Sequence, residues 1–260
     1  MIPLISLCEP VGPPDAPLLV LGPSLGTSTE VWDGASAALR SRFRVAAWDL
    51  PGHGRSAPAT AGFTMGGLAD GVATALDGLG ERQALYAGVS LGGAVGLELA
   101  VRHGSRFKAV SIVCSGAVIG TPDGWRERAA AARRDGTVSL TEGSANRWFA
   151  PGSRERIPDV AARLLSSLAD FDDESYALCC EALAEYDVRS LLAGVSLPVQ
   201  AIWGAHDIVT PEASSRNIVA GVQDGELAEV KDAGHLAPAE CPAEVAGLLD
   251  EFFSRRAVAA

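Results

Sequence analysis

The first half of the chain alternates short apolar runs with longer amphipathic stretches. The apolar runs predict buried strands at residues 18–21, 44–48, 83–89 and 109–114. Between them, apolar positions recur at helical spacing, which predicts helices at residues 31–40, 65–79 and 91–103. Strands that alternate with helices form a parallel sheet whose two faces are both covered. The pattern therefore predicts an α/β fold.

The same alternation returns near the C-terminus. It predicts strands at residues 199–203 and 227–230 and helices at residues 211–220 and 242–253. Between these two regions the strand pattern stops, and helical patterns cover residues 125–134, 157–169 and 173–183. We therefore expect one α/β core, built from residues 1–119 and 194–260, with a helical cap inserted at residues 120–193.

Composition and charge narrow the classes of function. The 260 residues are 48% hydrophobic and 20% charged, as in an ordinary globular domain, and the net charge is −11. Such a charge argues against binding to nucleic acid or to an anionic membrane, since both need a basic face. An anionic substrate would have to meet local arginines. Residues 121–163 are the better candidate region, because they carry eight arginines against six acids.

The cysteines and the N-terminus indicate where the protein works. None of the five cysteines forms a CxxC pair or has histidines at metal-ligand spacing, so we expect no metal site and a reduced compartment. Residues 1–9 lack a basic stretch followed by an apolar run, and no segment reaches the ~18 apolar residues of a membrane span. We expect a cytoplasmic protein without export or anchoring.

Residues 88–92 read Gly-Val-Ser-Leu-Gly, between a predicted strand and a predicted helix. This is the context in which the GxSxG pattern forms a nucleophile elbow. The small glycines allow a sharp turn and close packing, while Ser90 would be held strained with its hydroxyl exposed. A glycine-rich turn without chemistry is the alternative. The elbow interpretation makes Ser90 the candidate nucleophile.

A serine nucleophile needs a general base, and four histidines are present. His235 follows the last predicted strand, at the sheet edge where the other loops also end, and is the candidate base. His103 ends the helix that Ser90 begins, where the helix dipole favours a cation. His53 would stabilise its own tight turn, although its loop also lies at the active edge and a minor role there stays open. His206 directly precedes an aspartate.

The third member of a triad is a carboxylate that fixes the tautomer of the histidine. Asp207 is the candidate, on the loop after the strand at residues 199–203, although it could also be a turn residue before the next helix. An oxyanion would need two backbone N–H donors. Leu91 is expected to supply one, and Leu25, on the loop after the first strand, the other.

With these residues in place, the chain resembles the α/β-hydrolases, and within them the 3-oxoadipate enol-lactonases of aromatic catabolism. The segments that carry the resemblance are 24–27 (SLGT), 32–33 (WD), 49–54 (DLPGHG), Trp125, 148–149 (WF) and 176–180 (YALCC). The sequence departs from that family at Pro23, where a polar residue is expected, and at Pro51, where many members have arginine.

The resemblance implies hydrolysis without a cofactor. Ser90, Asp207 and His235 match the family's triad. Ser90 would open a small lactone that bears a carboxylate, and water would then release 3-oxoadipate, a step of the β-ketoadipate pathway. For the substrate carboxylate we expect Arg133 or Arg134, with Trp148 and Trp125 as further substrate contacts, Trp148 forming a wall that excludes water.

Other functions fit the same residues. A carboxylesterase, another lactonase or a tailoring enzyme of secondary metabolism would keep the triad and change the substrate, because chemistry and specificity lie in different parts of a fold. A non-catalytic protein that binds a small ligand under the cap is a further alternative. A haloalkane dehalogenase would carry aspartate at position 90, which is serine here. The oligomeric state stays open.

Overall fold

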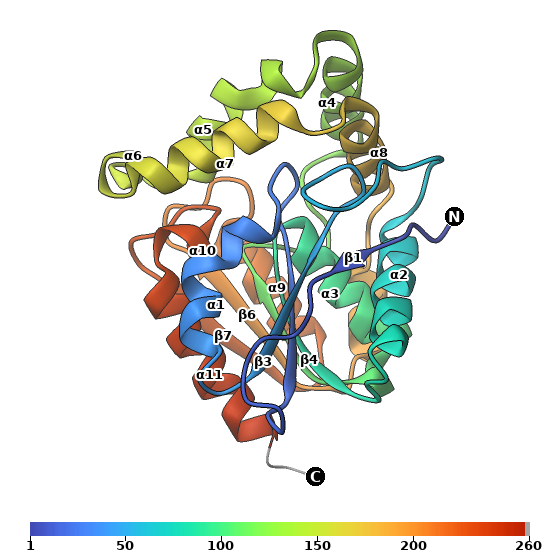
Figure 1. Ribbon diagram of the computed structural model, residues 1–260, viewed down its shortest axis with the longest axis vertical. Helices are drawn as coiled ribbons and strands as arrows, with labels where there is room; N and C mark the ends of the chain where they lie inside the picture. Colours follow the sequence, from blue (N-terminus) through green and yellow to red (C-terminus); the bar gives the residue numbers. More distant parts are fainter. Residues whose placement is uncertain (258–260) are drawn as a thin grey trace.

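A computed structural model describes residues 1–257 as a seven-stranded sheet in the order β1-β3-β2-β4-β5-β6-β7 (Figure 1). The strands are β1 (Ser6–Leu7), β2 (Leu18–Gly22), β3 (Arg44–Asp49), β4 (Ala84–Val89), β5 (Phe107–Val113), β6 (Val199–Gly204) and β7 (Gly225–Val230). All pairings between them are parallel except that of β1 with β3. The long parallel strands therefore end at one common edge.

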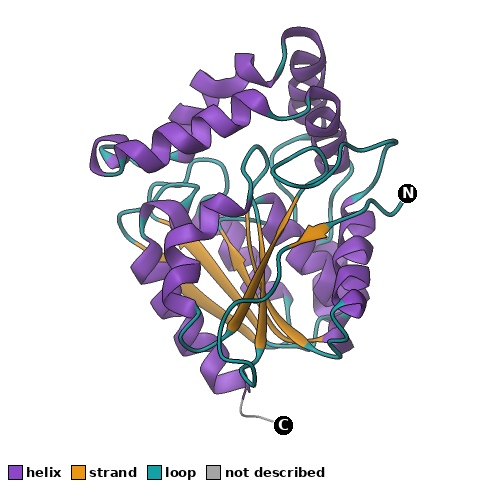
Figure 2. Cartoon of the chain, in the orientation of Figure 1, coloured by secondary structure: helices purple, strands orange, loops and turns teal. Residues whose placement is uncertain are grey.

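Helices cover both faces of this sheet (Figure 2). Those of the core are α1 (Asp33–Leu39), α2 (Met65–Gly78), α3 (Leu91–Arg102), α9 (Glu212–Gly221), α10 (Ala237–Glu240) and α11 (Pro242–Ala257). Helix α1 packs against α11, and α2 packs against α3. Every residue of β2 and β4 is buried, as expected for strands covered on both sides. The expected α/β architecture is confirmed.

Further helices lie between β5 and β6 in the sequence, beyond the carboxyl edge of the sheet (Figure 1). They are α4 (Pro122–Asp135), α5 (Thr141–Trp148), α6 (Ser153–Arg156), α7 (Pro158–Asp170) and α8 (Asp173–Ala184), called here the inserted helices. Helix α4 begins at an N-cap, where the Thr121 side chain accepts a hydrogen bond from the backbone of Gly124. The inserted helices stand above the position where the strand-ending loops meet.

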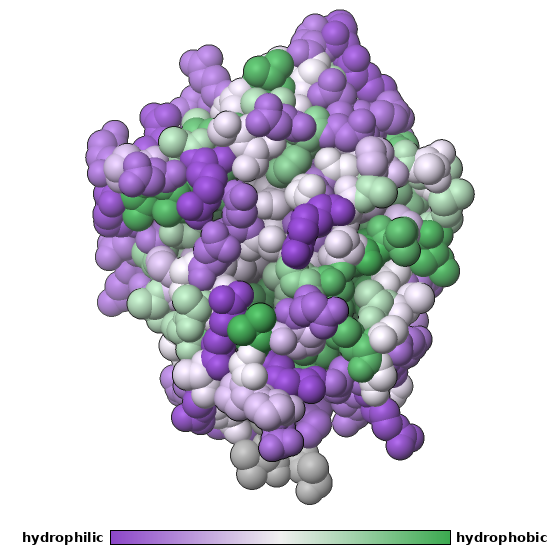
Figure 3. All heavy atoms as spheres, viewed as in Figure 1, coloured by the Kyte–Doolittle hydropathy of each residue, from purple (hydrophilic) through white to green (hydrophobic). Residues whose placement is uncertain are grey.

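The surface differs between these two parts. Figure 3 shows mainly hydrophilic side chains over the inserted helices and an apolar area near the N-terminus, where Met1, Ile2 and Leu4 are exposed. Among residues 1–257, no helix combines the length and the apolar character needed to cross a bilayer.

Some short elements were not predicted from the sequence. Strand β1 has only two residues, both half-buried, and so gives no alternating pattern. Helices α6 and α10 have four residues each, too few for a helical period to appear. The expected helix at residues 31–40 begins as a 3₁₀ helix, Thr29–Trp32, before α1 follows.

Candidate active site

Ser90 lies in a sharp turn between β4 and α3. Its backbone has φ 55° and ψ −117°, a conformation that costs a residue with a side chain about 1–3 kcal/mol. Hydrogen bonds with β5 and with the residues after it hold this turn in place. The N–H of Ser90 donates to the carbonyl oxygen of Val113 at 2.9 Å, and the hydroxyl of Ser115 donates to the carbonyl oxygen of Ser90 at 2.7 Å.

The glycines on either side of Ser90 are needed for this turn. A Cβ on Gly88 would lie 2.1 Å from the carbonyl oxygen of Gly92, and a Cβ on Gly92 would lie 2.5 Å from the carbonyl carbon of Gly22. The N–H of Gly92 also donates to the carbonyl oxygen of Pro23 at 2.9 Å. Because no side chain intervenes, the start of α3 is tied directly to the loop that follows β2.

The structure brings Ser90, His235 and Asp207 into one hydrogen-bonded chain. Nε2 of His235 lies 2.8 Å from Oγ of Ser90, and Nδ1 of His235 lies 2.9 Å from Oδ2 of Asp207. The three residues are buried, with exposed fractions of 7%, 3% and 5%. Both distances are within hydrogen-bond reach, so a proton can pass between the serine and the imidazole.

The carboxylate of Asp207 accepts three further hydrogen bonds besides the contact with His235. It accepts hydrogen bonds from the N–H of Val209 at 2.8 Å, the N–H of Thr210 at 3.0 Å and the hydroxyl of Thr210 at 2.7 Å. Burial alone would raise the pKa of Asp207, but the charge of His235 and the hydrogen bonds from His235 and Thr210 together hold that pKa below its ordinary value. Asp207 is therefore ionised at neutral pH.

The loop that carries His235 is bound to the C-terminal end of α5 and the residues that follow it. The N–H groups of His235 and Leu236 both donate to the carbonyl oxygen of Trp148, at 3.0 and 3.1 Å. This double hydrogen bond fixes the backbone next to the imidazole.

Glu240 joins the same two segments with its side chain. One carboxylate oxygen accepts the N–H of Ala150 at 2.7 Å, and the other accepts the N–H of Gly234 at 2.8 Å. The residue is only 3% exposed. Buried carboxylates need such partners to offset their lost hydration. The sequence analysis did not identify Glu240, because its partners are backbone groups from a distant segment.

Leu25 and Leu91, the expected oxyanion donors, both belong to segments next to the serine. Leu91 begins α3, and the first N–H groups of a helix have no acceptor within the helix. Leu25 follows β2 and lines the same cavity as Ser90. Their role in binding an oxyanion stays a prediction.

A small cavity of about 30 Å³ lies over the hydroxyl of Ser90. It is lined by Ser24, Leu25, Ser90, Trp125, Arg128, Arg147, Trp148, Tyr176, Val209 and His235. Both tryptophans expected from the sequence are therefore at this cavity. Leu25, Trp125, Trp148 and Val209 form its apolar walls, and its cationic groups are the guanidinium groups of Arg128 and Arg147.

Arg133 and Arg134 do not line this cavity, which corrects the arginines expected at the substrate. Arg133 is exposed and pairs with Glu174 and Glu181, and Arg134 is exposed and pairs with Asp135. Their carboxylate partners already satisfy them, so they are surface ion pairs.

Arg128, earlier on α4, lines the cavity, whereas Arg133 and Arg134 do not. Its Nε donates to the Tyr176 hydroxyl at 2.7 Å, and one terminal nitrogen donates to Oγ of Ser144 at 2.9 Å. These partners are neutral, so they orient the guanidinium without cancelling its charge. The spacing along α4 could have identified Arg128 from the sequence, because Trp125, Arg128 and the buried Ala132 share one face of that helix.

The other histidines have separate surroundings. Nε2 of His103 lies 2.8 Å from the Asp70 carboxylate, outside the cavity. Nδ1 of His53 lies 2.9 Å from the carbonyl oxygen of Pro51, as expected for a histidine that holds its own turn. The His53 ring is also packed against Phe171 of the insertion, with 4.4 Å between ring centroids, and burial lowers the pKa of His53 to about 4.

No cluster of three or more His, Cys, Asp or Glu side chains suited to a metal ion occurs among residues 1–257. The five cysteines are free thiols.

Residues 17–241 match the family model described as the alpha/beta hydrolase fold. The chain is 36% identical to 3-oxoadipate enol-lactonase 2 of Acinetobacter baylyi, over 89% of this chain and 86% of that protein. It is 28% identical to a pimeloyl-[acyl-carrier protein] methyl ester esterase of Aromatoleum aromaticum, over 90% and 97% of the two chains. The crystal structure of an enol-lactonase from Burkholderia xenovorans LB400 superposes with a TM-score of 0.92, at 32% identity and 96% coverage of both chains.

Proposed function

The chain belongs to the α/β-hydrolase fold family, and from this premise we propose that it hydrolyses 3-oxoadipate enol-lactone to 3-oxoadipate, in the β-ketoadipate pathway of aromatic catabolism. The observation that carries the proposal is the pair of cationic side chains beside Ser90, Arg128 and Arg147, in a small cavity that is also lined by Trp125 and Trp148. A neutral ester would not need these cationic groups. A small lactone that bears a carboxylate would.

The first half of the reaction forms an acyl-enzyme. Oγ of Ser90 attacks the lactone carbonyl carbon while its proton passes to Nε2 of His235, 2.8 Å away. Asp207 holds the imidazole in the required tautomer and stabilises its charged form. When the ring C–O bond breaks, His235 returns the proton to the leaving enol oxygen. That oxygen stays attached to the acyl chain and tautomerises to the 3-oxo group.

The oxyanion of the tetrahedral intermediate is assigned to the N–H groups of Leu25 and Leu91. Each such donor contributes roughly 10²–10³ in rate. The turn at Ser90 leads directly into α3, whose first N–H group is that of Leu91. The tie between Gly92 and Pro23 sets the spacing of the two donors.

Water completes the reaction. His235 takes a proton from a water molecule that attacks the acyl carbon, and the proton then goes to Oγ of Ser90 as the ester bond breaks. The product is 3-oxoadipate, which loses a proton to become a dicarboxylate. The proposed chemistry uses side chains and water alone and requires no cofactor.

The inserted helices are proposed to act as a cap within residues 120–193. They bring Trp125, Trp148 and Arg128 over Ser90 and leave a cavity of about 30 Å³. Arg128 is assigned to the substrate carboxylate, because neutral partners fix its guanidinium in place. A charge-assisted hydrogen bond at a site of this kind contributes about 1.5–3 kcal/mol.

A substrate panel tests the proposal. Purified protein is assayed at neutral pH with 3-oxoadipate enol-lactone, neutral lactones and simple carboxylic esters, beside the Ser90→Ala variant. We expect the enol-lactone to have the highest kcat/KM and Ser90→Ala to lose nearly all turnover. Esterase activity without enol-lactone hydrolysis would replace the proposed substrate with a neutral ester. Turnover that survives Ser90→Ala would refute the mechanism.

A further inference from the structure

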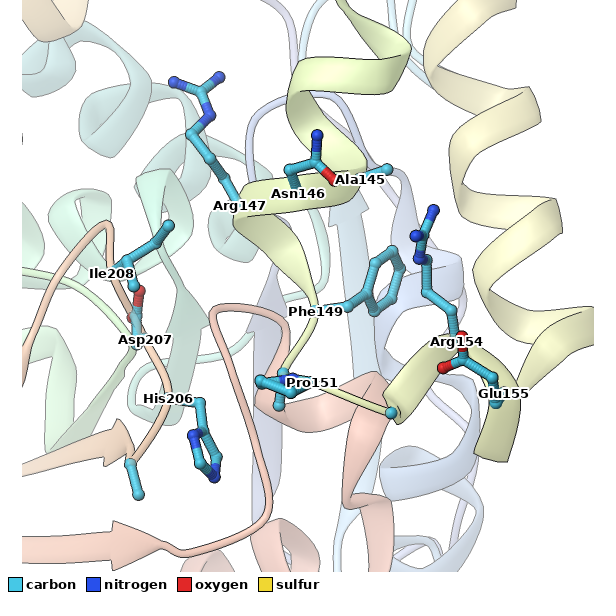
Figure 4. Close-up of a pocket in the computed structure, with 13 residues that line it drawn as sticks. Ala145, Asn146, Arg147, Phe149, Pro151, Arg154, Glu155, His206, Asp207 and Ile208 are labelled. Atoms are coloured by element: carbon cyan, nitrogen blue, oxygen red, sulfur yellow. The ribbon is translucent and has the colours of Figure 1, made fainter.

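Arg147, the penultimate residue of α5, lies where three cavities meet. It lines the small cavity over Ser90, a cavity of about 350 Å³ beside Trp125 and Ile208, and a cavity of about 530 Å³ beside Phe149. The last of these is drawn in Figure 4, in which Arg147 and Arg154 lie on opposite sides of Phe149. Arg147 thus borders both the reacting serine and the open solvent spaces.

The charge of Arg147 is not neutralised by the protein. Within residues 1–257 it has no carboxylate in ion-pair distance, and its side chain is exposed. Arg133 and Arg134, on the neighbouring α4, are both ion-paired. Arg128 differs again, because two neutral hydroxyl groups hold it in place. The cavity therefore has one fixed guanidinium and one that is free to reorient.

Hydrolysis of a lactone changes the number of charges in this cavity. The substrate of the proposed reaction brings one carboxylate, and cleavage creates a second at the carbon that was bonded to Ser90. That new carboxylate forms next to the His235–Asp207 pair, in a protein of net charge −11. Coulomb repulsion from Asp207 is poorly screened at such a buried site.

We propose that Arg147 is a second carboxylate-binding group, which together with Arg128 makes the active site bind dicarboxylates more tightly than monocarboxylates. Arg128 holds the carboxylate already present in the substrate. Arg147 pairs with the carboxylate formed at Ser90 and, since it borders both open cavities, accompanies the product out of the site. This inference rests on the proposed function, because only the hydrolysed product carries two carboxylates.

Arg147 also has an alternative role within its own helix that needs no ligand. Arg147 lies in the last turn of α5, where a cation interacts favourably with the helix dipole whether or not a ligand is bound. An arginine with this role alone would make no distinction between ligands with one or two carboxylates.

Equilibrium binding separates the two explanations. Adipate and hexanoate have the same number of carbons and differ in the second carboxylate. Isothermal titration calorimetry with the full chain should show that adipate binds roughly tenfold more tightly than hexanoate, because one charge-assisted hydrogen bond of about 1.5 kcal/mol corresponds to about that factor. In Arg147→Ala the two affinities should become nearly equal, mainly through weaker adipate binding.

Arg126→Ala is the matched control, since Arg126 is an exposed arginine of α4 that pairs with Glu185 and lines none of these three cavities. It should keep the preference for adipate. Equal binding of the two acids to the unmodified protein, or a preference that survives Arg147→Ala, would overturn the inference. Calorimetry measures binding without turnover, so its result is independent of the substrate panel. The protein can prefer adipate and yet not hydrolyse the enol-lactone, or hydrolyse the enol-lactone without preferring adipate.

Discussion

The backbone N–H of His235 donates a hydrogen bond of 3.0 Å to the carbonyl oxygen of Trp148. The first residue is the proposed base, and the second belongs to the inserted helices and forms a wall of the cavity. One hydrogen bond therefore connects the part of the molecule that performs the chemistry with the part proposed to select the substrate.

Replacing Asp207 by asparagine tests the role of the carboxylate. The amide cannot stabilise a charged imidazole and favours the wrong tautomer, so kcat should fall by about 10⁴-fold with little change in KM. Steady-state kinetics on the best substrate of the panel gives both values. Asp232→Asn is the control, because Asp232 is exposed three residues before His235 and should leave kcat unchanged. Near-normal kcat in Asp207→Asn would remove Asp207 from the mechanism.

Arg128→Met should lower kcat/KM for the enol-lactone by roughly 10–100-fold, as expected for loss of a charge-assisted hydrogen bond. Methionine preserves much of the side-chain volume, so activity on an uncharged lactone of similar size should change little. Arg133→Met serves as the comparison, since Arg133 pairs with Glu174 on the surface. A larger loss of kcat/KM in Arg133→Met than in Arg128→Met would return the role of binding the substrate carboxylate to Arg133, as expected from the sequence.

Glu240→Gln places an amide NH₂ against one of the N–H groups that the carboxylate now accepts, on Ala150 or Gly234. We expect the free energy of unfolding to fall by about 1–3 kcal/mol. Well below the melting temperature, kcat should fall more than KM rises, because the loop of His235 shifts while the arginines stay in place.

Glu244→Gln, an exposed change on α11, is the control for that experiment and should alter neither quantity. An unchanged kcat in Glu240→Gln, accompanied by the expected loss of stability, would limit Glu240 to a role in folding.

His53 predicts a pH dependence of stability. Its pKa is about 4 in the folded protein, against an ordinary value of 6.5, so between these pH values the unfolded chain binds more protons. Stability should therefore fall as the pH drops from about 6.5 to 4, by about 3 kcal/mol in total. Urea unfolding of the unmodified protein and of His53→Asn across this range measures the effect. In His53→Asn the free energy of unfolding should fall less steeply over this pH range. The same dependence of that free energy on pH in both proteins would contradict the prediction.

The sequence predicts most of the sheet and the position of the elbow because the signals are local. Glycines at positions 88 and 92 are needed for the turn itself, and β2 and β4 are continuous buried runs. His235 and Asp207 could be chosen since the loops after parallel strands meet at one edge. The roles given to these residues stay proposals.

Side chains that depend on contacts between distant segments were missed. The choice of Arg133 and Arg134 used charge alone, whereas the phase of α4 decides which arginine faces the cavity. Glu240 and Arg147 have no local pattern. The function of Glu240 depends on Ala150, which is 90 positions away in the sequence, and the position of Arg147 depends on where α5 ends.

The hydrogen bonds at Trp148 and Glu240 also set a direction for the passage of ligands. A movement of the segment at Ala150 would pull the loop of His235 with it and break up the reacting groups each time the site opened. Among residues 1–257, no hydrogen bond joins Trp125 of α4 to the loop of His235, whereas Ile208, across the adjoining cavity, directly follows Asp207 and so belongs to the segment that holds the histidine. A movement of α4 at Trp125 alone would open that side of the cavity and leave the imidazole in position, so product could be exchanged for substrate without rebuilding the active site at every turnover.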